Sequence, residues 1–150
     1  MRSTAYIGGG CSRRTLFECL MNIAETIQFL KSGRDVDAQI EAFNDLESRV
    51  TETDVPILLA ALESDTSDFW VRELLAQPII RLSGAKALPQ LMAALRRNFE
   101  EGHDNDGFAF FLIELAKSNP DNVRGQLQSL AATAGKAELK DINWLLEYCT

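Results

Sequence analysis

Apolar residues between positions 54 and 84 follow the spacing of two consecutive helices. In the first half they fall at positions i, i+3, i+4 and i+7, which form one face of a helix: Val55, Leu58, Leu59 and Leu62. A polar break at residues 64–67 follows, and the second half repeats the helical spacing up to Gly84, a typical stop, with Val71, Leu74, Leu75, Ile79 and Leu82. The pattern predicts an antiparallel helical hairpin whose apolar faces need partners from the flanking sequence.

The polar residues around these stripes predict where each helix begins. Thr53 is a candidate N-cap of the first helix, and Pro56 is tolerated in a first turn because no amide partner is needed there. Ser67 or Asp68 can cap the second helix. Pro78 lies inside that helix and predicts a kink, since its ring clashes with the carbonyl group four residues earlier.

The hairpin recurs at a fixed offset. Pro89 lies 33 residues after Pro56, and the same offset pairs apolar positions in both helices: Leu58 with Leu91, Ala60 with Ala93, Ala61 with Ala94, Leu62 with Leu95, Ala76 with Ala109, Ile79 with Leu112, Ile80 with Ile113 and Leu82 with Leu115. Such a period is typical of stacked helical repeats.

The unit resembles a HEAT-type or armadillo-type helical repeat. A proline opens its first helix, and residues 68–72 (DFWVR) resemble the family's Asp-x-x-Val-Arg pattern. In that family the Asp and Arg form a polar ladder between repeats, so the resemblance implies structural roles for Asp68 and Arg72. The next repeat departs from the pattern, since residues 104–108 (DNDGF) contain no Arg, which implies a divergent solenoid. The resemblance covers residues 35–148 and concerns the fold, from which function does not follow.

The flanking sequence predicts further helical pairs on both sides. The expected helices are 13–30 and 36–50, then 86–100 and 105–117, then 121–133 and 137–148, with Ile40, Phe43, Leu46 and Val50 facing inward on the second of them. The expected fold is therefore all-α: stacked antiparallel helical hairpins forming a short HEAT-like α-solenoid of about eight helices. Residues 1–12 are expected to be a flexible leader, and residues 13–150 a single helical-repeat domain.

Composition narrows the classes of function. The net charge of −7 and pI near 4.7 argue against nucleic acid and anionic membrane surfaces, which require a basic surface. Cys11, Cys19 and Cys149 have no metal-binding spacing and form no even set, which favours a reducing cytoplasm. No apolar run approaches the roughly 20 residues of a transmembrane helix.

Candidate catalytic residues are sparse. His103 is the single histidine and has no partner in the sequence around it that would make a general base or a metal ligand. Residues 104–107 (DNDG) resemble the start of a calcium loop, but the glycine comes two positions early and Leu115 stands where the bidentate Glu belongs. We expect no catalytic residues, no cofactor and no metal.

The charge distribution points to a protein partner. Residues 33–69 carry ten acids and two arginines, while residues 70–99 are net basic. This banding is either an ordinary solvated surface or an acidic face that steers a basic partner. Helical spacing on the second helices selects a ridge that combines a large aromatic residue with acids: Trp70, Glu73, Gln77 and Arg81, then His103, Asp106, Phe110 and Glu114. Trp70 fits equally an interface anchor and a packing residue between repeats.

Adjacent helical residues point about 100° apart, so Phe110 and Phe111 cannot both face inward. The sequence therefore predicts that one of the two is exposed or lies at an edge.

These observations favour a non-catalytic protein-binding module. The most concrete hypothesis, from size, acidity and the missing catalytic set, is a bacterial immunity protein or antitoxin that binds and neutralises a basic toxin. The alternatives are an adaptor or assembly factor of an intracellular complex, and an enzyme subunit whose site needs another chain. The candidate partner-binding residues are Asp35, Asp37, Glu41, Asp68, Trp70, Glu73, Gln77, Asp104, Asp106, Phe110 and Glu114.

Overall fold

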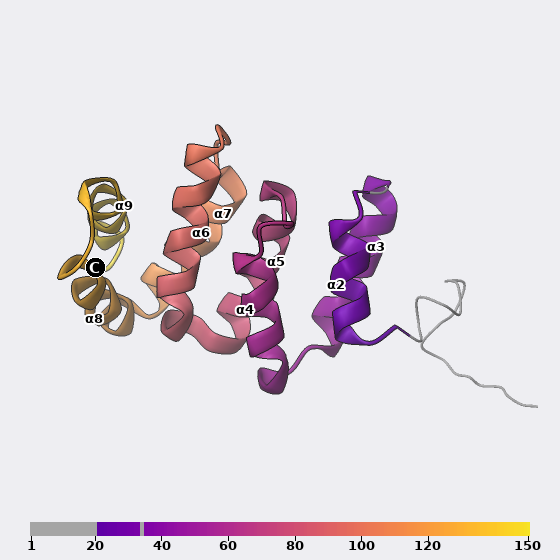
Figure 1. The fold of residues 1–150 in the computed structure, drawn as a ribbon. Coiled ribbons are helices and arrows are strands. Elements are labelled where there is room, and N and C mark those ends of the chain that lie inside the picture. The colour runs from indigo at the N-terminus through magenta and orange to yellow at the C-terminus, as the bar shows by residue number, and fades with distance from the viewer. Residues whose placement is uncertain (1–20, 34) are drawn as a thin grey trace, which may run out of the picture. The chain divides into compact units, whose positions relative to one another are not determined.

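The computed structural model describes residues 21–33 and 35–150, and every regular element in these ranges is helical (Figure 1). The expectation of an all-α protein is confirmed for this part of the chain. The predicted leader at residues 1–12, Cys11 and Cys19 lie outside the described residues. Contacts group the chain into two compact units, one ending at Val50 and one spanning Thr51–Thr150, and each is described by itself. The single domain expected over residues 13–150 stays a prediction.

The first unit contains α2 (Ile23–Lys31) and α3 (Val36–Arg49). Asn22 starts α2 with a reciprocal capping box: its side chain accepts from the Glu25 amide at 2.8 Å, and its own amide donates to the Glu25 carboxylate at 3.0 Å. The extended backbone of Asn22 (ψ 175°) is incompatible with a continuing helix. The predicted continuous helix over residues 13–30 is therefore wrong at Asn22, because this polar residue caps α2; residues 13–20 lie outside the described residues.

The packing of α2 on α3 buries Leu30, Phe43 and Leu46. Ile40, predicted to face inward, is 39% exposed, and the neighbouring Gln39 takes the buried place. The Gln39 amide donates to the Leu30 carbonyl at 2.7 Å and so caps the end of α2 from inside the unit. The pattern of apolar residues could not predict that a glutamine is buried here. The reason lies in the last carbonyl groups of α2, which have no partner within the helix and require a donor.

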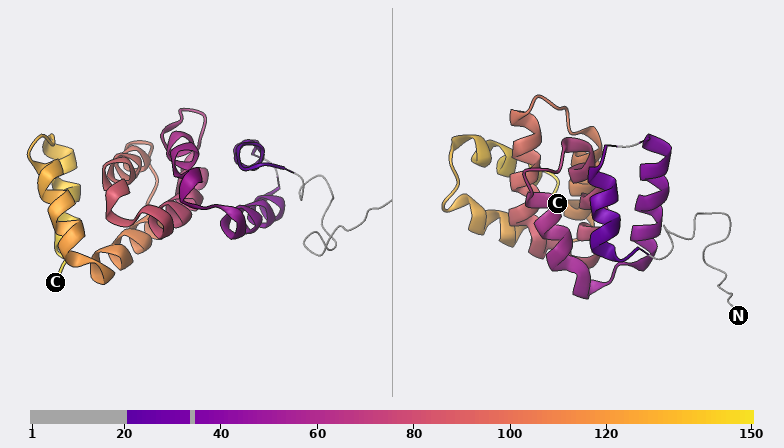
Figure 2. Two further views of the ribbon diagram at one scale, coloured as in Figure 1. Left: turned by 90° about the horizontal axis from the view of Figure 1, so that it is seen from below. Right: turned by 45° about the vertical axis from the view of Figure 1, so that its right-hand side comes forward.

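The second unit contains the remaining helices (Figures 1 and 2). In chain order these are the 3₁₀ turn η2 (Glu52–Asp54), α4 (Val55–Glu63), α5 (Phe69–Ser83), the 3₁₀ turn η3 (Gly84–Ala87), α6 (Leu88–Glu100), α7 (Asp106–Ser118), α8 (Pro120–Ala131) and α9 (Lys136–Leu146). Consecutive helices α4 and α5, and α8 and α9, pack together. Each helix also contacts the one two positions later: α4 with α6, α5 with α7, α6 with α8 and α7 with α9.

The predicted N-cap of α4 is wrong. Thr53 does not cap α4; instead Asp54 accepts from the Thr51 amide at 2.9 Å and closes the preceding 3₁₀ turn. Asp68 caps α5 by accepting from the Val71 amide at 2.9 Å, as predicted. Gly84 ends α5 with φ 57°, a region that glycine reaches at little cost. Pro78 is buried inside α5, and the kink it predicts stays a prediction.

The 33-residue offset relates equivalent structural positions. Pro56 and Pro89 each occupy the second residue of a helix that follows a 3₁₀ turn. The pairs Leu58 with Leu91, Leu62 with Leu95, and Ile79 with Leu112 are all buried to 1% exposure or less. Each such side chain contributes about 1.5–3 kcal/mol on burial. At these three pairs the sequence repeat therefore marks core positions, whereas Ala60 and Ala93, which the offset also pairs, are both exposed.

A buried arginine links α5 to the far end of α6. The Arg72 side chain is 0% exposed; its Nε donates to Asn98 Oδ1 at 2.6 Å, Nη1 donates to the Ser67 carbonyl at 2.6 Å, and Nη2 pairs with Glu101. Asn98 in turn donates to Asn105 Oδ1 at 2.8 Å, and Asn105 Nδ2 donates to the Leu95 carbonyl at 3.0 Å. The chain of bonds fixes the α6–α7 connection against α5.

This network supports the structural role implied for Arg72. Asp68 caps α5 and is not among its partners, which are Ser67 before α5, Asn98 on α6 and Glu101 at the end of α6. Asn105 lies 33 residues after Arg72, at the position where the second repeat lacks the arginine. It is buried, has left-handed backbone (φ 63°), and joins the same network. At the position where the second repeat lacks the arginine, a shorter polar side chain thus takes part in the network.

Glu101 is held by two arginines at the end of α6. Partial desolvation favours its neutral form, but hydrogen bonds from Arg97 (3.0 Å) and Arg72 outweigh this and hold the pKa of the carboxyl below its ordinary value. The pairs stabilise the fold only while Glu101 is ionised.

Replacing Arg72 with methionine keeps most of the side-chain volume and removes the guanidinium. We expect Arg72→Met to lower the free energy of unfolding by about 3 kcal/mol, since the buried acceptors of Asn98 and Ser67 lose their donor. Urea unfolding measures the change, with Lys86→Met, at an exposed position in η3, as the matched control. A loss below about 1 kcal/mol would exclude the network as a major source of stability.

Glu101→Gln should flatten the acid limb of the stability curve. Because the pKa of Glu101 is lowered on folding, its contribution is complete above the ordinary value of 4.5 and is lost as the pH falls through the lower folded-state pKa. Urea midpoints measured from neutral pH downward should therefore converge for the variant and the native protein at low pH. A parallel offset at every pH, or the same effect from Glu63→Gln at an exposed position, would contradict this.

Candidate functional site

The predicted ridge lies on two helices that contact each other. Trp70, Glu73 and Gln77 come from α5, and Asp106, Phe110 and Glu114 from α7. Gln77, Asp106, Phe110 and Glu114 are exposed, whereas Trp70 and Glu73 are half-buried. We refer to these six residues as the α5–α7 face.

Phe110 is the most exposed large apolar side chain in the described chain, at 58%. Its ring and that of the half-buried Phe111 form a T-shaped pair with centroids 5.7 Å apart. The prediction that one of the two phenylalanines is exposed is confirmed. Asp106 and Glu114 lie four residues before and after it, on the same side of α7. An apolar ring with a carboxylate one turn away on each side therefore projects from this helix.

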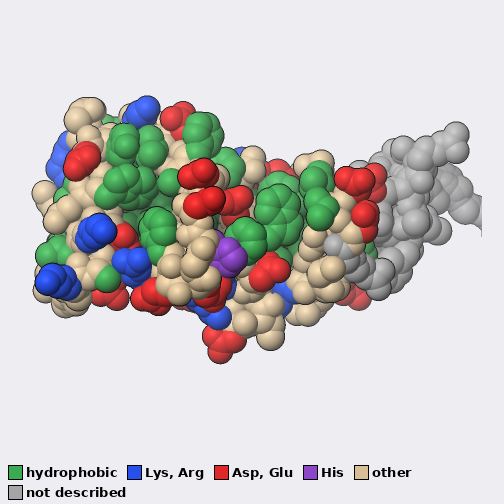
Figure 3. All heavy atoms as spheres, turned by 90° about the horizontal axis from the view of Figure 1, so that it is seen from above, with side chains coloured by type: hydrophobic (Ala, Val, Ile, Leu, Met, Phe, Trp, Pro, Cys, Tyr) green, Lys and Arg blue, Asp and Glu red, His purple; other side chains and the backbone are tan. Residues whose placement is uncertain are grey.

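Phe69 and His103 stack at one end of the same pair of helices. Their ring centroids are 3.8 Å apart and their planes differ by 17°. In Figure 3 the single histidine lies beside hydrophobic side chains with acidic side chains near it. Helical spacing placed His103 on the predicted ridge without a partner. The stack arises because the α6–α7 connection is held against the start of α5. The 33-residue offset relates His103 to Trp70. It therefore points to the residue next to Phe69, which is the one that stacks on His103.

Glu73 lies against the first turn of α7. A Cβ atom at Gly107 would stand 2.8 Å from the Glu73 carboxyl carbon, so the glycine leaves the space that the carboxylate occupies. Gly107 is the second residue of α7, where unpaired amides and the helix dipole favour a negative charge. Glu73 is therefore a contact between the two helices as well as a surface acid.

Trp70 combines features of both of its predicted roles. It is half-buried, and no described residue accepts a hydrogen bond from its buried Nε1 atom. A buried indole N–H normally finds a partner. The packing role and the anchor role both stay predictions.

Several predicted acids have local backbone roles. Asp68 caps α5, and Asp104 accepts from the Asp106 amide at 3.4 Å. In the first unit Asp35 caps α3 by accepting from the Ala38 amide at 3.0 Å, while Asp37 and Glu41 are exposed on that helix. The acids of α3 thus belong to the other unit, and of the acids predicted to bind a partner only Asp68, Glu73, Asp104, Asp106 and Glu114 share the second unit with Phe110.

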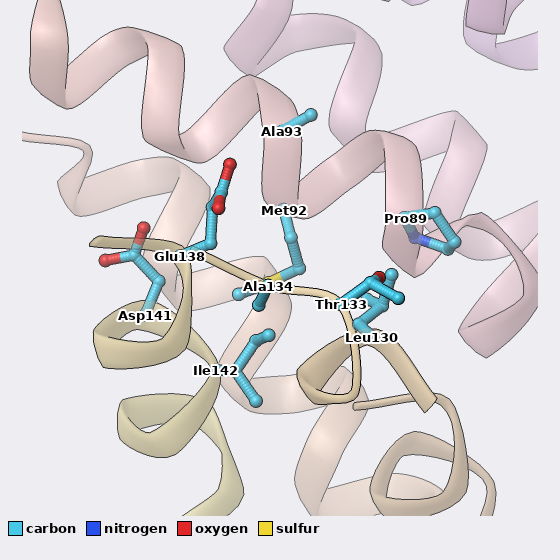
Figure 4. Close-up of a pocket in the computed structure, with 9 residues that line it drawn as sticks. All are labelled: Pro89, Met92, Ala93, Leu130, Thr133, Ala134, Glu138, Asp141 and Ile142. Carbon is cyan, nitrogen blue, oxygen red and sulfur yellow. The ribbon is translucent and has the colours of Figure 1, made fainter. Parts of the chain in front are cut away.

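The second unit also contains a cavity of about 200 Å³ beside α6 and the α8–α9 connection (Figure 4). Its lining is mainly apolar and includes Met92, Leu130 and Ile142, with the carboxylates of Glu138 and Asp141 on α9. Burial raises the pKa of Asp141 against the opposing effect of Arg96. Sequence reasoning missed Asp141, because it reads as a solvated acid on an amphipathic helix.

Comparisons with known proteins gave no match: no family model, no curated protein and no solved structure is similar to this chain. Among the described residues, no helix is long and apolar enough to cross a membrane, and no group of three or more His, Cys, Asp or Glu is placed to hold a metal ion. Cys149 is buried, and burial raises the pKa of its thiol.

The contact of Glu73 with α7 can be tested by stability. Glu73→Gln should lower the free energy of unfolding by about 0.5 kcal/mol, because the neutral amide loses the interaction with the positive end of the helix dipole. Glu114→Gln, in the middle of the exposed side of α7, is the control and should leave stability unchanged. Equal effects of the two substitutions, measured by thermal unfolding at low salt, would rule out the dipole interaction.

Proposed function

We propose that Thr51–Thr150 forms a short, divergent HEAT-like α-solenoid. Two features support this: the 33-residue offset joins buried leucine and isoleucine positions in both helices of the hairpin, and each helix contacts the one two positions later. In this arrangement α4, α6 and α8 form one layer and α5, α7 and α9 the other. Helices of one layer then present an extended surface suited to binding another protein.

The observation that carries the functional proposal is the exposure of Phe110 between Asp106 and Glu114. An exposed aromatic ring costs free energy in water, and an aromatic residue at the centre of a protein interface contributes strongly to affinity. Carboxylates at its rim select a basic partner and speed association. Gln77 and Glu73 of α5 extend the same surface, with Trp70 at its half-buried border.

The function that fits this surface best is neutralisation of a basic protein by a non-catalytic binder, most concretely a bacterial immunity protein or antitoxin with its toxin. A toxin that acts on nucleic acid carries a basic surface for phosphate groups. The acids of the α5–α7 face would occupy that surface and exclude the substrate. The net charge of −7 supports such a partner.

The first step of the test is to capture partners from the native lysate with the tagged full chain. The second step is to measure the affinity of variants for the captured protein. We expect one small basic protein at near-equal amount, whose toxicity in a growth assay disappears when this chain is co-expressed. Phe110→Ala should weaken its binding about thirtyfold, or roughly 2 kcal/mol, as expected for an interface anchor. Ile57→Ala, which truncates an exposed apolar residue on α4, is the matched control and should leave the affinity unchanged.

Charge reversal separates the two acidic surfaces. Asp106→Lys with Glu114→Lys should slow association and reduce its dependence on salt, whereas Asp37→Lys with Glu41→Lys in the first unit should not. Asp35 is left intact because it caps α3. If the first-unit variant slowed association more than the α7 variant, the interface would lie on the first unit. If the capture experiment recovered a large assembly in place of one toxin, an adaptor function would be favoured.

A further inference from the structure

A second hollow in the second unit lies between α6, α7 and α9. Its volume is about 400 Å³, and its lining consists of Arg96, Phe99, Ala109, Lys140, Asp141 and Trp144. This volume falls within the range of about 300–1,000 Å³ that is usual for small-molecule sites. None of the six residues of the α5–α7 face lines the hollow, so it is separate from the surface proposed to bind a protein.

Two aromatic rings line this hollow without covering each other. Phe99 is 41% exposed, and Trp144 is half-buried. Within the described chain, the Trp144 ring contacts Tyr148, with centroids 5.9 Å apart, and the Arg96 guanidinium lies 5.3 Å from the centroid of Phe99; the rings of Phe99 and Trp144 do not contact each other. Aromatic surface left in water costs free energy, and a ring placed in the hollow would cover part of both side chains at once.

Lys140 is the charged group of this lining that has no ion pair among the described residues, and it is exposed on α9. Arg96 and Asp141 pair with each other, with Nη1 and Oδ2 3.4 Å apart, and Arg96 also lies 3.9 Å from Glu100 outside the lining. The Lys140 ammonium is therefore the group of the hollow that is open to a ligand's charge, and it attracts one negative charge.

We propose that the α6–α7–α9 hollow binds a small aromatic carboxylate, a flat ring system that carries one negative charge. The ring packs against Phe99 and Trp144, and the carboxylate accepts hydrogen bonds from the Lys140 ammonium. The two aromatic side chains favour a flat ligand over an aliphatic chain. The ammonium favours a carboxylate over a neutral group, because a hydrogen bond between charged groups is about twice as strong.

The test uses 2-naphthoate, a flat bicyclic carboxylate, as probe with the full chain. The two tryptophans give two indole N–H signals in a ¹H–¹⁵N spectrum, which Trp70→Phe assigns. Titration should shift the Trp144 signal saturably and leave the Trp70 signal unchanged, because Trp70 does not line the hollow. The matched compound 2-naphthamide has the same ring system without the charge, and we expect it to bind about tenfold more weakly.

Substitutions in the hollow separate the charge from the rings. Lys140→Gln should weaken 2-naphthoate binding about tenfold and leave 2-naphthamide binding unchanged. Lys136→Gln is the matched control: it changes the net charge equally, at an exposed lysine one turn earlier on α9 that does not line the hollow, and should leave both affinities unchanged. Phe99→Ala removes one wall and should weaken both compounds by a similar factor.

Lys140 and Phe99 are exposed, so we expect unchanged thermal unfolding of their variants, which establishes that the fold is intact. The proposal is overturned if the Trp144 signal does not shift, if the two compounds bind with equal affinity, or if Lys136→Gln weakens 2-naphthoate binding as much as Lys140→Gln. None of these outcomes depends on a protein partner, so the result is independent of the function proposed for the α5–α7 face.

Discussion

The second unit depends on a guanidinium group that water does not reach. Arg72 is placed on α5 by the helical register, but its partners come from the loop before that helix and from the end of α6. A buried cation without partners would cost several kcal/mol, so these groups must assemble together or not at all. This requirement fixes the position of α6 along the axis of α5 more precisely than leucine packing could, since apolar contacts are not directional.

The same constraint shapes the surface. By holding the α6–α7 connection, the network sets where α7 starts, and with it the position of Asn105 in its left-handed backbone. Phe69 then stacks on His103, and Glu73 reaches the first turn of α7 beside Gly107. The exposed stripe of Asp106, Phe110 and Glu114 follows from this start by helical periodicity alone. A structural network in the interior thus determines which side chains a partner would meet.

Acidic residues in this protein have three kinds of position, which a count of charges does not separate. Asp35, Asp54 and Asp68 bind backbone amides near helix starts, where a carboxylate satisfies unpaired donors. Asp106 and Glu114 project from the side of α7, whereas Asp141 is buried beside Arg96. Of these acids, Asp106 and Glu114 present their carboxylates to a partner.

Periodicity in the sequence by itself determined the all-α class, most helix boundaries in the second unit and the core positions related by the 33-residue offset. These features are local, or repeat at a fixed spacing, and each is encoded by neighbouring residues. The start of α2 at Asn22 is also local, because its capping partner Glu25 lies three residues later. Gln39 as a buried residue, the partners of Arg72 and the burial of Asp141 beside Arg96 were decided by tertiary structure. Each depends on a polar group brought from a distant segment, and hydropathy along the chain carries no information on which distant donors and acceptors will meet.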